Sequence, residues 1–158
     1  MKYYFSADYH FGHSRIIKYA DRPFDNVEEM NQTIINNHNN IVSPEDTVFF
    51  LGDFCFSGYD YEDKLNGKFI FIKGNHDHGS SKKAIIDRMV INHGGKKILL
   101  IHDYNKVENK DNYDIILCGH IHAKWKVKDN FINVGVDVWD FKPHTINTIL
   151  GAWYRGQN

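Results

Sequence analysis

Five short apolar runs of the sequence each end close to polar residues of the kinds that bind metal ions. The runs are YYFSA (3–7), VFFL (48–51), FIFI (69–72), ILLI (98–101) and IILC (115–118). Continuous apolar runs of four or five residues indicate strands that are buried on both faces, as in layered α/β proteins. The sequence therefore predicts an α/β fold with these five runs as buried strands.

The polar residues that follow the runs are of a few types only. They are Asp8-Tyr9-His10, Gly52-Asp53, Gly74-Asn75-His76, His102 and Gly119-His120-Ile121-His122. In α/β sheets, ligands gather outside the carboxyl ends of the strands. Because burying so many carboxylates and imidazoles without partners is costly, these side chains are either solvated or coordinated to something. We expect the five clusters to converge in space.

Helical segments are expected between some of the strands. Asn26 with Glu29 three residues later predicts a capping box. In the segment 26–40 that follows, apolar residues recur at helical spacing, namely Val27, Met30, Ile34 and Ile35. A shorter helix is expected after Ser80-Ser81, carrying Ala84, Ile85 and Met89. The segment 91–101 reads as two strands joined by a turn at Gly94-Gly95.

Length and charge limit the class of protein. The 158 residues are expected to form a single domain, 1–158. A net charge of −1, from 19 basic and 20 acidic residues, gives no general field for long nucleic acid, although a local basic face is possible. Two cysteines make no disulfide framework, and the first residues lack the features of a signal peptide. With no apolar run near the roughly 20 residues that cross a bilayer, we expect a cytoplasmic protein without a membrane partner.

The seven candidate ligands form a mixed oxygen and nitrogen set. They comprise two carboxylates, one amide oxygen and four imidazoles, in Asp8, His10, Asp53, Asn75, His102, His120 and His122. Such a set suits Mn, Fe, Zn, Co or Ni rather than calcium or a structural thiolate zinc. Seven side chains are too many for one four-coordinate ion but suit two ions if one carboxylate bridges. Paired divalent ions, which keep a net positive charge in such a set, commonly catalyse displacement at phosphorus.

The motif series resembles that of the calcineurin-like metallophosphoesterase superfamily. The matching residues, in order, are Asp8-x-His10, Gly52-Asp53, Gly74-Asn75-His76-Asp77, His102 and Gly119-His120-x-His122. The stretches HFGH, RPF and NVGVDVWDFKP also resemble its small, capless bacterial and phage branch. The resemblance implies a four-layer α/β/β/α sandwich with two central mixed sheets and a dinuclear metal site between the strand ends.

The resemblance also implies roles for single residues. It assigns one metal to Asp8, His10, Asp53 and His122, and the other to Asp53, Asn75, His102 and His120, so that Asp53 bridges. It implies two divalent ions, with Mn²⁺ expected and Fe, Zn, Co or Ni as alternatives. The implied reaction is hydrolysis of small phosphoesters by a metal-bridging hydroxide, with phosphodiesters favoured over monoesters.

His76 and Asp77 are the expected catalytic pair. His76 is surplus to the two ligand sets and is expected to contact the phosphate and to stabilise the transition state or protonate the leaving oxygen. Asp77 is expected to fix the tautomer of His76. His13 and Arg15 are candidate phosphate contacts, with a structural bond to a neighbouring loop and a surface position at a helix start as the respective alternatives.

Other polar residues have less specific interpretations. Cys118 reads as a small buried hydrophobic residue at a strand end. His38 and His93 are expected to be solvated at a helix end and at a turn, and His144 to occupy a loop or edge position. The roles of three titratable residues stay open. Asp137 and its neighbour Trp139 either pack in the interior or contact the substrate. Asp103 is a possible competitor for metal, and His78 is a possible site residue.

Two further functions stay open. The chain could be a protein-binding scaffold that keeps this fold without catalysis, although such a scaffold would be expected to have lost His76 or a ligand. It could also be a nuclease, against which the near-neutral charge argues. The sequence predicts neither the physiological substrate nor the oligomeric state.

Overall fold

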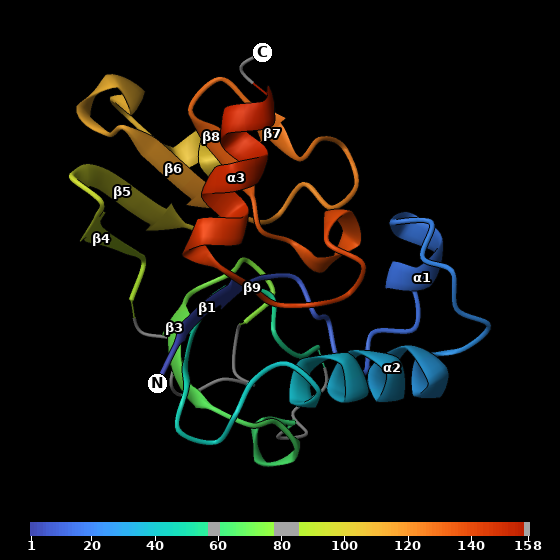
Figure 1. The fold of residues 1–158 in the computed structure, drawn as a ribbon. Helices are drawn as coiled ribbons and strands as arrows, with labels where there is room; N and C mark the ends of the chain where they lie inside the picture. Colours follow the sequence, from blue (N-terminus) through green and yellow to red (C-terminus); the bar gives the residue numbers. More distant parts are fainter. Residues whose placement is uncertain (57–60, 78–85, 157–158) are drawn as a thin grey trace.

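The apolar runs form strands of two mixed β-sheets in the computed structural model, which describes residues 1–56, 61–77 and 86–156. One sheet has the order β3-β2-β1-β9 and the other β4-β5-β6-β8-β7 (Figure 1). The strands are β1 (Tyr3–Ser6), β2 (Thr47–Leu51), β3 (Lys68–Ile72), β4 (Arg88–His93), β5 (Lys96–Ile101), β6 (Ile115–Cys118), β7 (Val127–Lys128), β8 (Phe131–Asn133) and β9 (His144–Thr145).

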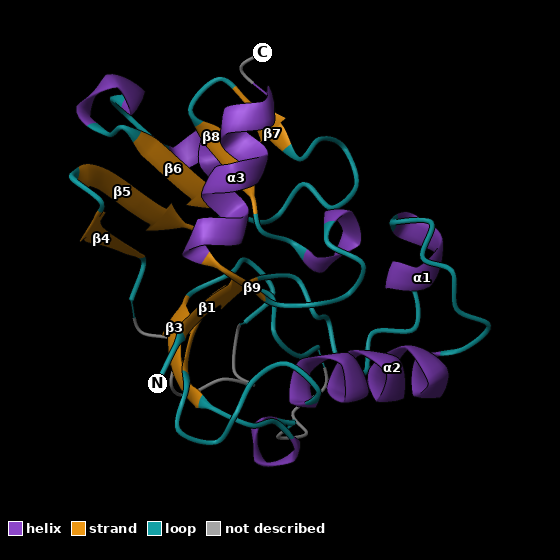
Figure 2. Cartoon of the chain, viewed as in Figure 1, coloured by secondary structure: helices purple, strands orange, loops and turns teal. Residues whose placement is uncertain are grey.

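Helices and 3₁₀ turns cover and connect the sheets (Figure 2). They are α1 (Ile16–Tyr19), α2 (Val27–Asn39), α3 (Ile146–Gly156), η1 (Glu62–Lys64), η2 (Tyr104–Lys106), η3 (Lys110–Asn112) and η4 (Val136–Val138). None of the helices in the described segments has the length and apolar character needed to span a bilayer. The mixed α/β fold with two sheets that the sequence predicts is confirmed.

The pairing of the strands places the ends of the apolar runs on one side of the molecule. In the first sheet, β1, β2 and β3 are parallel and β9 is antiparallel to β1. In the second, β5, β6 and β8 are parallel, while the edge strands β4 and β7 are antiparallel to their neighbours. The five strands that were predicted from the sequence are therefore the parallel β1, β2, β3, β5 and β6, whose carboxyl ends carry the polar clusters.

Alternate side chains of each buried strand pack on opposite faces, which explains the unbroken apolar runs. In β6, Ile115 and Leu117 belong to the core between the two sheets, together with residues of β1, β2 and β3. Ile116 and Cys118 of the same strand pack on the other face. Since both faces exclude water, every position of the run is apolar. Cys118 is fully buried among aliphatic and aromatic side chains, as the sequence predicts.

The long helix α2 covers the outer face of the first sheet (Figure 1). Its buried residues Met30 and Ile34 pack against Phe50 of β2. The Asn26 side chain accepts a hydrogen bond from the Glu29 backbone N–H at 2.8 Å, as expected for an N-cap. The carboxylate of Glu29 accepts in turn from the backbone N–H of Asp25 rather than from that of Asn26. The predicted capping box is thus formed with its return bond shifted by one residue.

The outer face of the second sheet has a different cover. Leu99, Ile101 and Ile116 pack there against aromatic residues of η2 and of the loops, among them Tyr104 and Trp125. Helix α3 instead contributes to the core between the sheets and contacts β1, β7 and β9. In the described part of the chain, the fourth layer of the sandwich therefore consists of 3₁₀ turns and loops.

The hairpin expected around Gly94-Gly95 is confirmed, and the helix before it is not. Strands β4 and β5 pair in the antiparallel sense across a two-residue turn in which Gly94 and Gly95 have φ of 56° and 75°. Two positive φ angles are typical of the hairpin turn that suits strand twist and favours glycine. Of the helix expected after Ser80-Ser81, residues 80–85 lie outside the described residues. Met89 belongs to strand β4, so its assignment to a helix is wrong.

His38 is buried rather than solvated, which corrects the sequence interpretation. Its Nδ1 lies 2.8 Å from the Tyr9 hydroxyl and its Nε2 lies 2.8 Å from the Asn66 carbonyl oxygen. Its ring also stacks on Phe69 at 5.6 Å. The end of α2 packs against the loop before β3, a contact that local sequence does not encode. His93 lies in β4 rather than at the turn, and His144 lies in the edge strand β9, as predicted.

We expect His38 to make the protein less stable in mild acid. Burial lowers the pKa of His38 to about 4, below its ordinary value of 6.5. Above pH 6.5 both folded and unfolded chains carry the neutral ring; between pH 6.5 and 4 only the unfolded chain binds the proton. Stability is therefore lost as the pH falls through this window, by about 2–3 kcal/mol. Urea unfolding of His38→Gln and of the unaltered protein at pH 7 and pH 4.5 measures this difference. Equal losses in both proteins would contradict the assignment.

Candidate metal centre

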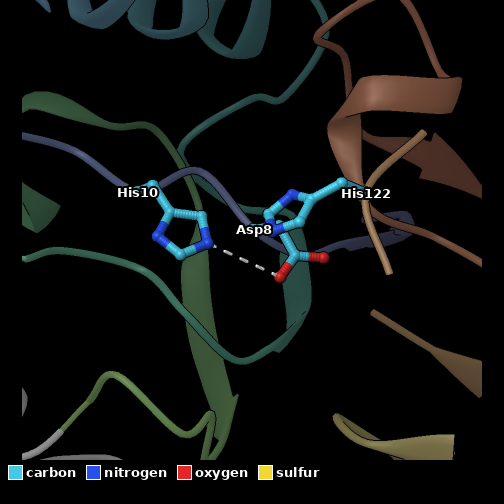
Figure 3. A group of neighbouring side chains, drawn as sticks. All are labelled: Asp8, His10 and His122. Carbon is cyan, nitrogen blue, oxygen red and sulfur yellow. Dashed lines mark ion pairs between the residues drawn. The ribbon is translucent and has the colours of Figure 1, made fainter. Parts of the chain in front are cut away.

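The predicted ligands converge where the carboxyl ends of five strands meet. Their ligand atoms form two groups, each with all atoms within 4.8 Å of one another: Asp8, His10 and His122, and Asp53, His102 and His120. Figure 3 shows the side chains of His10 and His122 converging on the carboxylate of Asp8. The residues come from the turns after β1, β2, β5 and β6. The structure thus brings together side chains that are more than 100 positions apart in the sequence.

The backbone at the site adopts an uncommon conformation. Five of the candidate ligand residues have positive φ, namely Asp8 (59°), His10 (53°), Asp53 (57°), His120 (73°) and His122 (50°). A residue other than glycine is strained by roughly 1–3 kcal/mol in this region and stays there only where its surroundings hold it. Hydrogen bonds between neighbouring turns, from Asp8 N–H to Gly52 O and from His10 N–H to Asp53 O, both 3.0 Å, provide that hold. Such concentrated strain is typical of functional sites.

In the first group, the Nε2 atom of His10 gives the clearest indication of a cation site. This atom is buried, lies 3.5 Å from Asp53 Oδ2 and 3.9 Å from Asp8 Oδ1, and has no hydrogen-bond partner among the described residues. Burial lowers the pKa of His10 to about 2, so the ring is neutral. Burial also raises the pKa of Asp8 to about 6. A buried, unpartnered ring nitrogen facing two carboxylates fits a bound cation.

His122 is oriented by a residue whose role the sequence left open. The Nδ1 of His122 lies 3.0 Å from Oδ2 of Asp137, so the proton on Nδ1 directs Nε2 toward Asp8 and His10. Burial opposes the charge on Asp137, but the His122 bond and the Arg22 guanidinium hold the pKa of this carboxyl below its ordinary value. A carboxylate behind a histidine ligand commonly fixes the ring and makes it a better ligand.

Arg22 is the residue of the site that sequence reasoning missed. It donates from Nε to Asp137 Oδ1 at 2.8 Å and from Nη2 to Asp137 Oδ2 at 3.0 Å. It also donates to the backbone carbonyls of Asp8, at 2.6 Å, and Tyr9, at 3.0 Å. The guanidinium therefore links the turn after β1 to the carboxylate behind His122. The two partners lie in the stretches RPF and NVGVDVWDFKP, but neither stretch by itself indicates the contact.

Asn133 and Trp139 have structural roles near His122. The Asn133 amide donates to the carbonyls of His122, at 2.7 Å, and Trp125, at 3.0 Å, and its oxygen accepts from Gly135 N–H. The Trp139 ring N–H donates to the Asn133 carbonyl at 2.7 Å. These bonds hold the turn that carries His122. Trp139 is thus a packing residue, whereas Asp137 contacts a candidate ligand directly.

The second group has its acceptor atoms facing one another. His102 donates from Nδ1 to the Leu51 carbonyl at 2.7 Å, which leaves Nε2 pointing to Asn75 Oδ1 at 2.9 Å and to Asp53 Oδ2 at 3.3 Å. Nδ1 of His120 also lies 2.9 Å from Asn75 Oδ1. Such mutual approach of lone pairs is stable only when a proton or a metal ion lies between them. The geometry fits a second cation.

Without a metal ion, a proton takes this position. Burial alone would lower the pKa of His102, but the hydrogen bond to Asp53 and the negative charges of Asp8 and Asp53 raise it to about 9. Burial likewise works against the charge of Asp53, yet the bond to His102 and the neighbouring imidazoles bring the pKa of Asp53 below its ordinary range. Since ligands must be deprotonated, metal binding here would displace the proton of His102.

Asp53 connects the two groups. Its Oδ2 contacts Nε2 of His10 in the first group and Nε2 of His102 in the second, while its Oδ1 accepts from the backbone N–H of His76 at 2.8 Å. Gly74 lies directly beside it, because a Cβ at that position would come within 2.2 Å of Asp53 Oδ1. Close approach to Asp53, rather than a positive φ, therefore explains the glycine before Asn75.

Asp77 has a different role from the one predicted. Its Oδ2 accepts from the backbone N–H groups of Gly74, at 2.7 Å, and Asp53, at 2.9 Å, and its Oδ1 accepts from that of Phe54 at 3.0 Å. Three backbone donors occupy the carboxylate, so it holds the turn after β2 instead of orienting His76. The local order of residues suggested a catalytic pair, but the tertiary contacts turn Asp77 away from it.

His76 and His13 lie at the rim of the site. The exposed ring of His76 lies 5.6 Å from that of His10 and 6.3 Å from that of His13. His13 stacks on the ring of Phe56 at 4.2 Å, and its buried Nδ1 has no hydrogen-bond partner among the described residues. Arg15 is exposed and immediately precedes α1, where its side chain makes no capping bond. The structure thus brings His13 and His76 to the first group and leaves Arg15 at the surface.

Asp103 and His78 are the remaining residues whose roles the sequence left undecided. Oδ1 of Asp103 accepts from the backbone N–H of Asn105 at 3.0 Å and from its side chain at 3.1 Å. Asp103 belongs to neither of the two ligand groups found among the described residues. His78 lies outside the described residues.

Replacing Asp137 with Asn is expected to weaken metal binding by roughly 10- to 100-fold, because the ring of His122 loses its orienting carboxylate. Calorimetric titration with Mn²⁺ measures the affinity, and Asp63→Asn, an exposed aspartate of η1, is the matched control. The change leaves Arg22 buried without its counter-charge, so the double variant Arg22→Gln/Asp137→Asn separates misfolding from misorientation. Unaltered affinity in a folded Asp137→Asn protein would rule out this role.

Comparisons with known proteins agree with this geometry. Residues 1–146 match the model of the calcineurin-like phosphoesterase superfamily domain. The chain is 39% identical over 171 residues to the uncharacterized protein MJ1445 of Methanocaldococcus jannaschii, covering 99% of this chain and 93% of the relative. It is similar to the crystal structure of AQ665 from Aquifex aeolicus, with 28% identity, a TM-score of 0.74 and coverage of 95% and 98% of the two chains.

A more distant structural neighbour shares the fold alone. A single mutant of Vps29 from Entamoeba histolytica is 20% identical, with a TM-score of 0.51 over 84% of this chain and 73% of that one. The family match, in contrast, spans most of the chain and includes all seven candidate ligands. The protein belongs to the calcineurin-like phosphoesterase superfamily.

Proposed function

We propose that the protein hydrolyses phosphodiesters with the help of two divalent cations. The family and the two ligand groups support metal-dependent phosphoester hydrolysis in general. The observation that carries the proposal is the buried Nε2 of His10, which has no partner among the described residues and faces the carboxylates of Asp8 and Asp53. A site built in this way is suited to a cation rather than to a protein partner.

The contacts around Asp53 support two ligand sets. Asp8, His10, Asp53 and His122 would hold one cation, and Asp53, Asn75, His102 and His120 the other, with Asp53 shared. The mixed oxygen and nitrogen donors favour Mn²⁺ or a similar first-row ion. When bound, such ions supply Lewis acidity toward a phosphoryl oxygen and a nucleophile at neutral pH.

The remaining groups would bind the phosphate and move the proton. His76 lies at the exposed rim with its backbone N–H bound to Asp53, which leaves the ring free to protonate the leaving oxygen. His13 would contact a phosphoryl oxygen through its ring, which lies 6.3 Å from that of His76. Because His120 and His122 are only half-buried and His76 is exposed, the site is open on that side. An open site has room for the second ester group of a diester.

A protein-binding scaffold of the same fold is the alternative function. The likeness to Vps29 is compatible with it, since that likeness concerns the fold alone. The complete set of seven candidate ligands argues for the enzyme, because a scaffold has no need for an unpartnered buried imidazole. The two functions differ in whether the protein turns over a phosphodiester.

Metal removal tests the proposal directly. Dialysis against EDTA should abolish hydrolysis of bis(p-nitrophenyl) phosphate, and added Mn²⁺ should restore it, because the cations supply the nucleophile. Elemental analysis verifies the removal, and p-nitrophenyl phosphate in the same assay compares diester with monoester. Activity that survives verified removal would contradict a metal-dependent reaction. A metal-loaded protein that hydrolyses neither ester would favour the scaffold.

A further inference from the structure

A cavity of about 280 Å³ adjoins the second group of candidate ligands. Asn75 and His102 form one side of it. Three basic side chains, those of Lys73, Arg88 and Lys106, line the remainder together with acidic and backbone groups. The larger cavity of about 610 Å³ lies elsewhere, at the amino end of β1 beside Lys2 and Tyr3, and contains none of the candidate ligands. The basic cavity thus shares a wall with the second group of candidate ligands.

Three separate segments bring the basic residues together. Lys73 follows β3 of the first sheet, and its backbone N–H donates to the carbonyl of Ile86 at 2.8 Å, just before β4 of the second sheet. Arg88 opens β4 and pairs with Ile101, the residue before His102. Lys106 ends the 3₁₀ turn η2. The tertiary fold, not a run of basic residues in the sequence, therefore creates this concentration of positive charge.

The positive charge of the cavity is not neutralised by ion pairs. No ion pair with a described residue is formed by Lys73, Arg88 or Lys106, and all three side chains are exposed. Asp87 and Asp103 also line the cavity, which leaves one positive charge in excess. Asp103 is further occupied by the backbone and side-chain N–H groups of Asn105. A concave surface with unpaired cations concentrates anions, and the neighbouring metal charges would add to this field.

The size of the cavity limits what it can hold. At about 280 Å³ it is slightly smaller than the sites that enclose whole drug-sized ligands, roughly 300–1,000 Å³. It has room for a phosphoryl group with its water molecules. Lysine and arginine donate short, charge-assisted hydrogen bonds to phosphate oxygens. Because Asn75 and His102 line its wall, such a group would lie beside the second group of candidate ligands.

We propose that Lys73, Arg88 and Lys106 bind a second phosphate of the substrate, so that the preferred substrates are phosphodiesters that carry a further phosphomonoester. Esters of nucleoside 3′,5′-bisphosphates belong to this class. The proposal rests on the proposed function, since it concerns the substrate of the same site. The proposal also agrees with the near-neutral net charge of the chain. A single basic pocket can bind one additional phosphate, whereas long nucleic acid would need a more extended positive surface.

Two substrates that differ by a single phosphate test the proposal. The p-nitrophenyl ester of thymidine 5′-phosphate and the same ester with a 3′-phosphate share leaving group and scissile bond. The metal-loaded protein is expected to show about 10- to 100-fold higher kcat/KM for the 3′-phosphorylated ester, mainly through KM, since charge-assisted bonds to the second phosphate are gained on binding. The triple variant Lys73→Gln/Arg88→Gln/Lys106→Gln is expected to lower this preference to about threefold or less.

A matched control and a binding measurement make the test decisive. Lys128→Gln, an exposed lysine of β7, should keep the full preference. Calorimetry should show that thymidine 3′,5′-bisphosphate binds the metal-loaded protein about tenfold more tightly than thymidine 5′-phosphate, and that the triple variant loses this difference. Equal kcat/KM for the two esters, or an equal effect of Lys128→Gln, would overturn the pocket. Absence of hydrolysis with a retained preference in binding would overturn the proposed function and keep the pocket.

Discussion

Replacing Asp53 with Asn is expected to release both cations together and to lower kcat/KM for bis(p-nitrophenyl) phosphate at least about 10³-fold, roughly 4 kcal/mol in the barrier. One oxygen of Asp53 faces Nε2 of His10 at 3.5 Å and Nε2 of His102 at 3.3 Å, so the substitution removes charge from both groups at once. Elemental analysis after dialysis measures the metal content, and initial rates with added Mn²⁺ measure the activity.

The substitution is designed to leave the turn intact. The amide oxygen of Asn can still accept from the His76 backbone N–H, the bond that Asp53 Oδ1 makes at 2.8 Å. Asp111→Asn, at an exposed position of η3, is the matched control for the loss of one carboxylate. Two tightly bound metals and near-normal turnover in Asp53→Asn would show that the site is assigned wrongly. Loss of one metal alone would place Asp53 in a single group.

The His76→Gln protein is expected to keep its metals and to lose activity in a way that depends on the leaving group. A nitrophenolate leaves without a proton, whereas a ribose or alkyl alkoxide needs one, so a general acid helps mainly the second, by about 10²–10⁴-fold. The ring of His76 is exposed and belongs to neither ligand group, and only its backbone contacts Asp53. These features suit a proton donor better than a ligand.

Two substrates on one protein separate the possible roles of His76. The kcat/KM of His76→Gln should fall far more for a 2′,3′-cyclic nucleotide than for bis(p-nitrophenyl) phosphate. His93→Gln in β4 controls for the loss of an imidazole away from the site. Equal losses on both substrates would mean that His76 stabilises charge on the phosphoryl oxygens instead. Loss of metal from His76→Gln would make it a ligand.

Local sequence was sufficient to predict the five buried strands and to indicate the candidate ligands. A run such as that of β6 is apolar at every position because Ile115 and Leu117 pack between the sheets while Ile116 and Cys118 pack outside. Each run is followed closely by a polar cluster, and parallel strands necessarily bring their carboxyl ends to one side. Strand direction therefore explains why the clusters of each sheet lie at one edge, while the packing of the two sheets brings the members of each ligand group together. Helix α2 was predictable for a similar reason, because its cap and its apolar spacing are local.

Interpretations that depended on distant partners were less successful. His38 sits at a helix end among asparagines, which suggests solvent, yet Tyr9 and the carbonyl of Asn66 enclose it. Asp77 follows His76 directly, which suggests a catalytic pair, yet its oxygens accept from the backbone of the turns that carry Asp53 and Gly74. In both cases the sequence shows which groups are available, but the packing of other segments decides which partner each group finds.

The sequence by itself determined the five buried strands, the seven candidate ligands and the family that their order resembles, because these depend on residue type and on short spacings. Only the tertiary structure decided how the ligands are held. Arg22 and Asp137 are 115 positions apart, and no local pattern links them. Together they orient His122 and hold the turn that carries Asp8 through hydrogen bonds. The same applies to Lys73, Arg88 and Lys106, which come from three segments. Contacts between distant segments arise from how the two sheets pack, and that packing is a property of the whole chain.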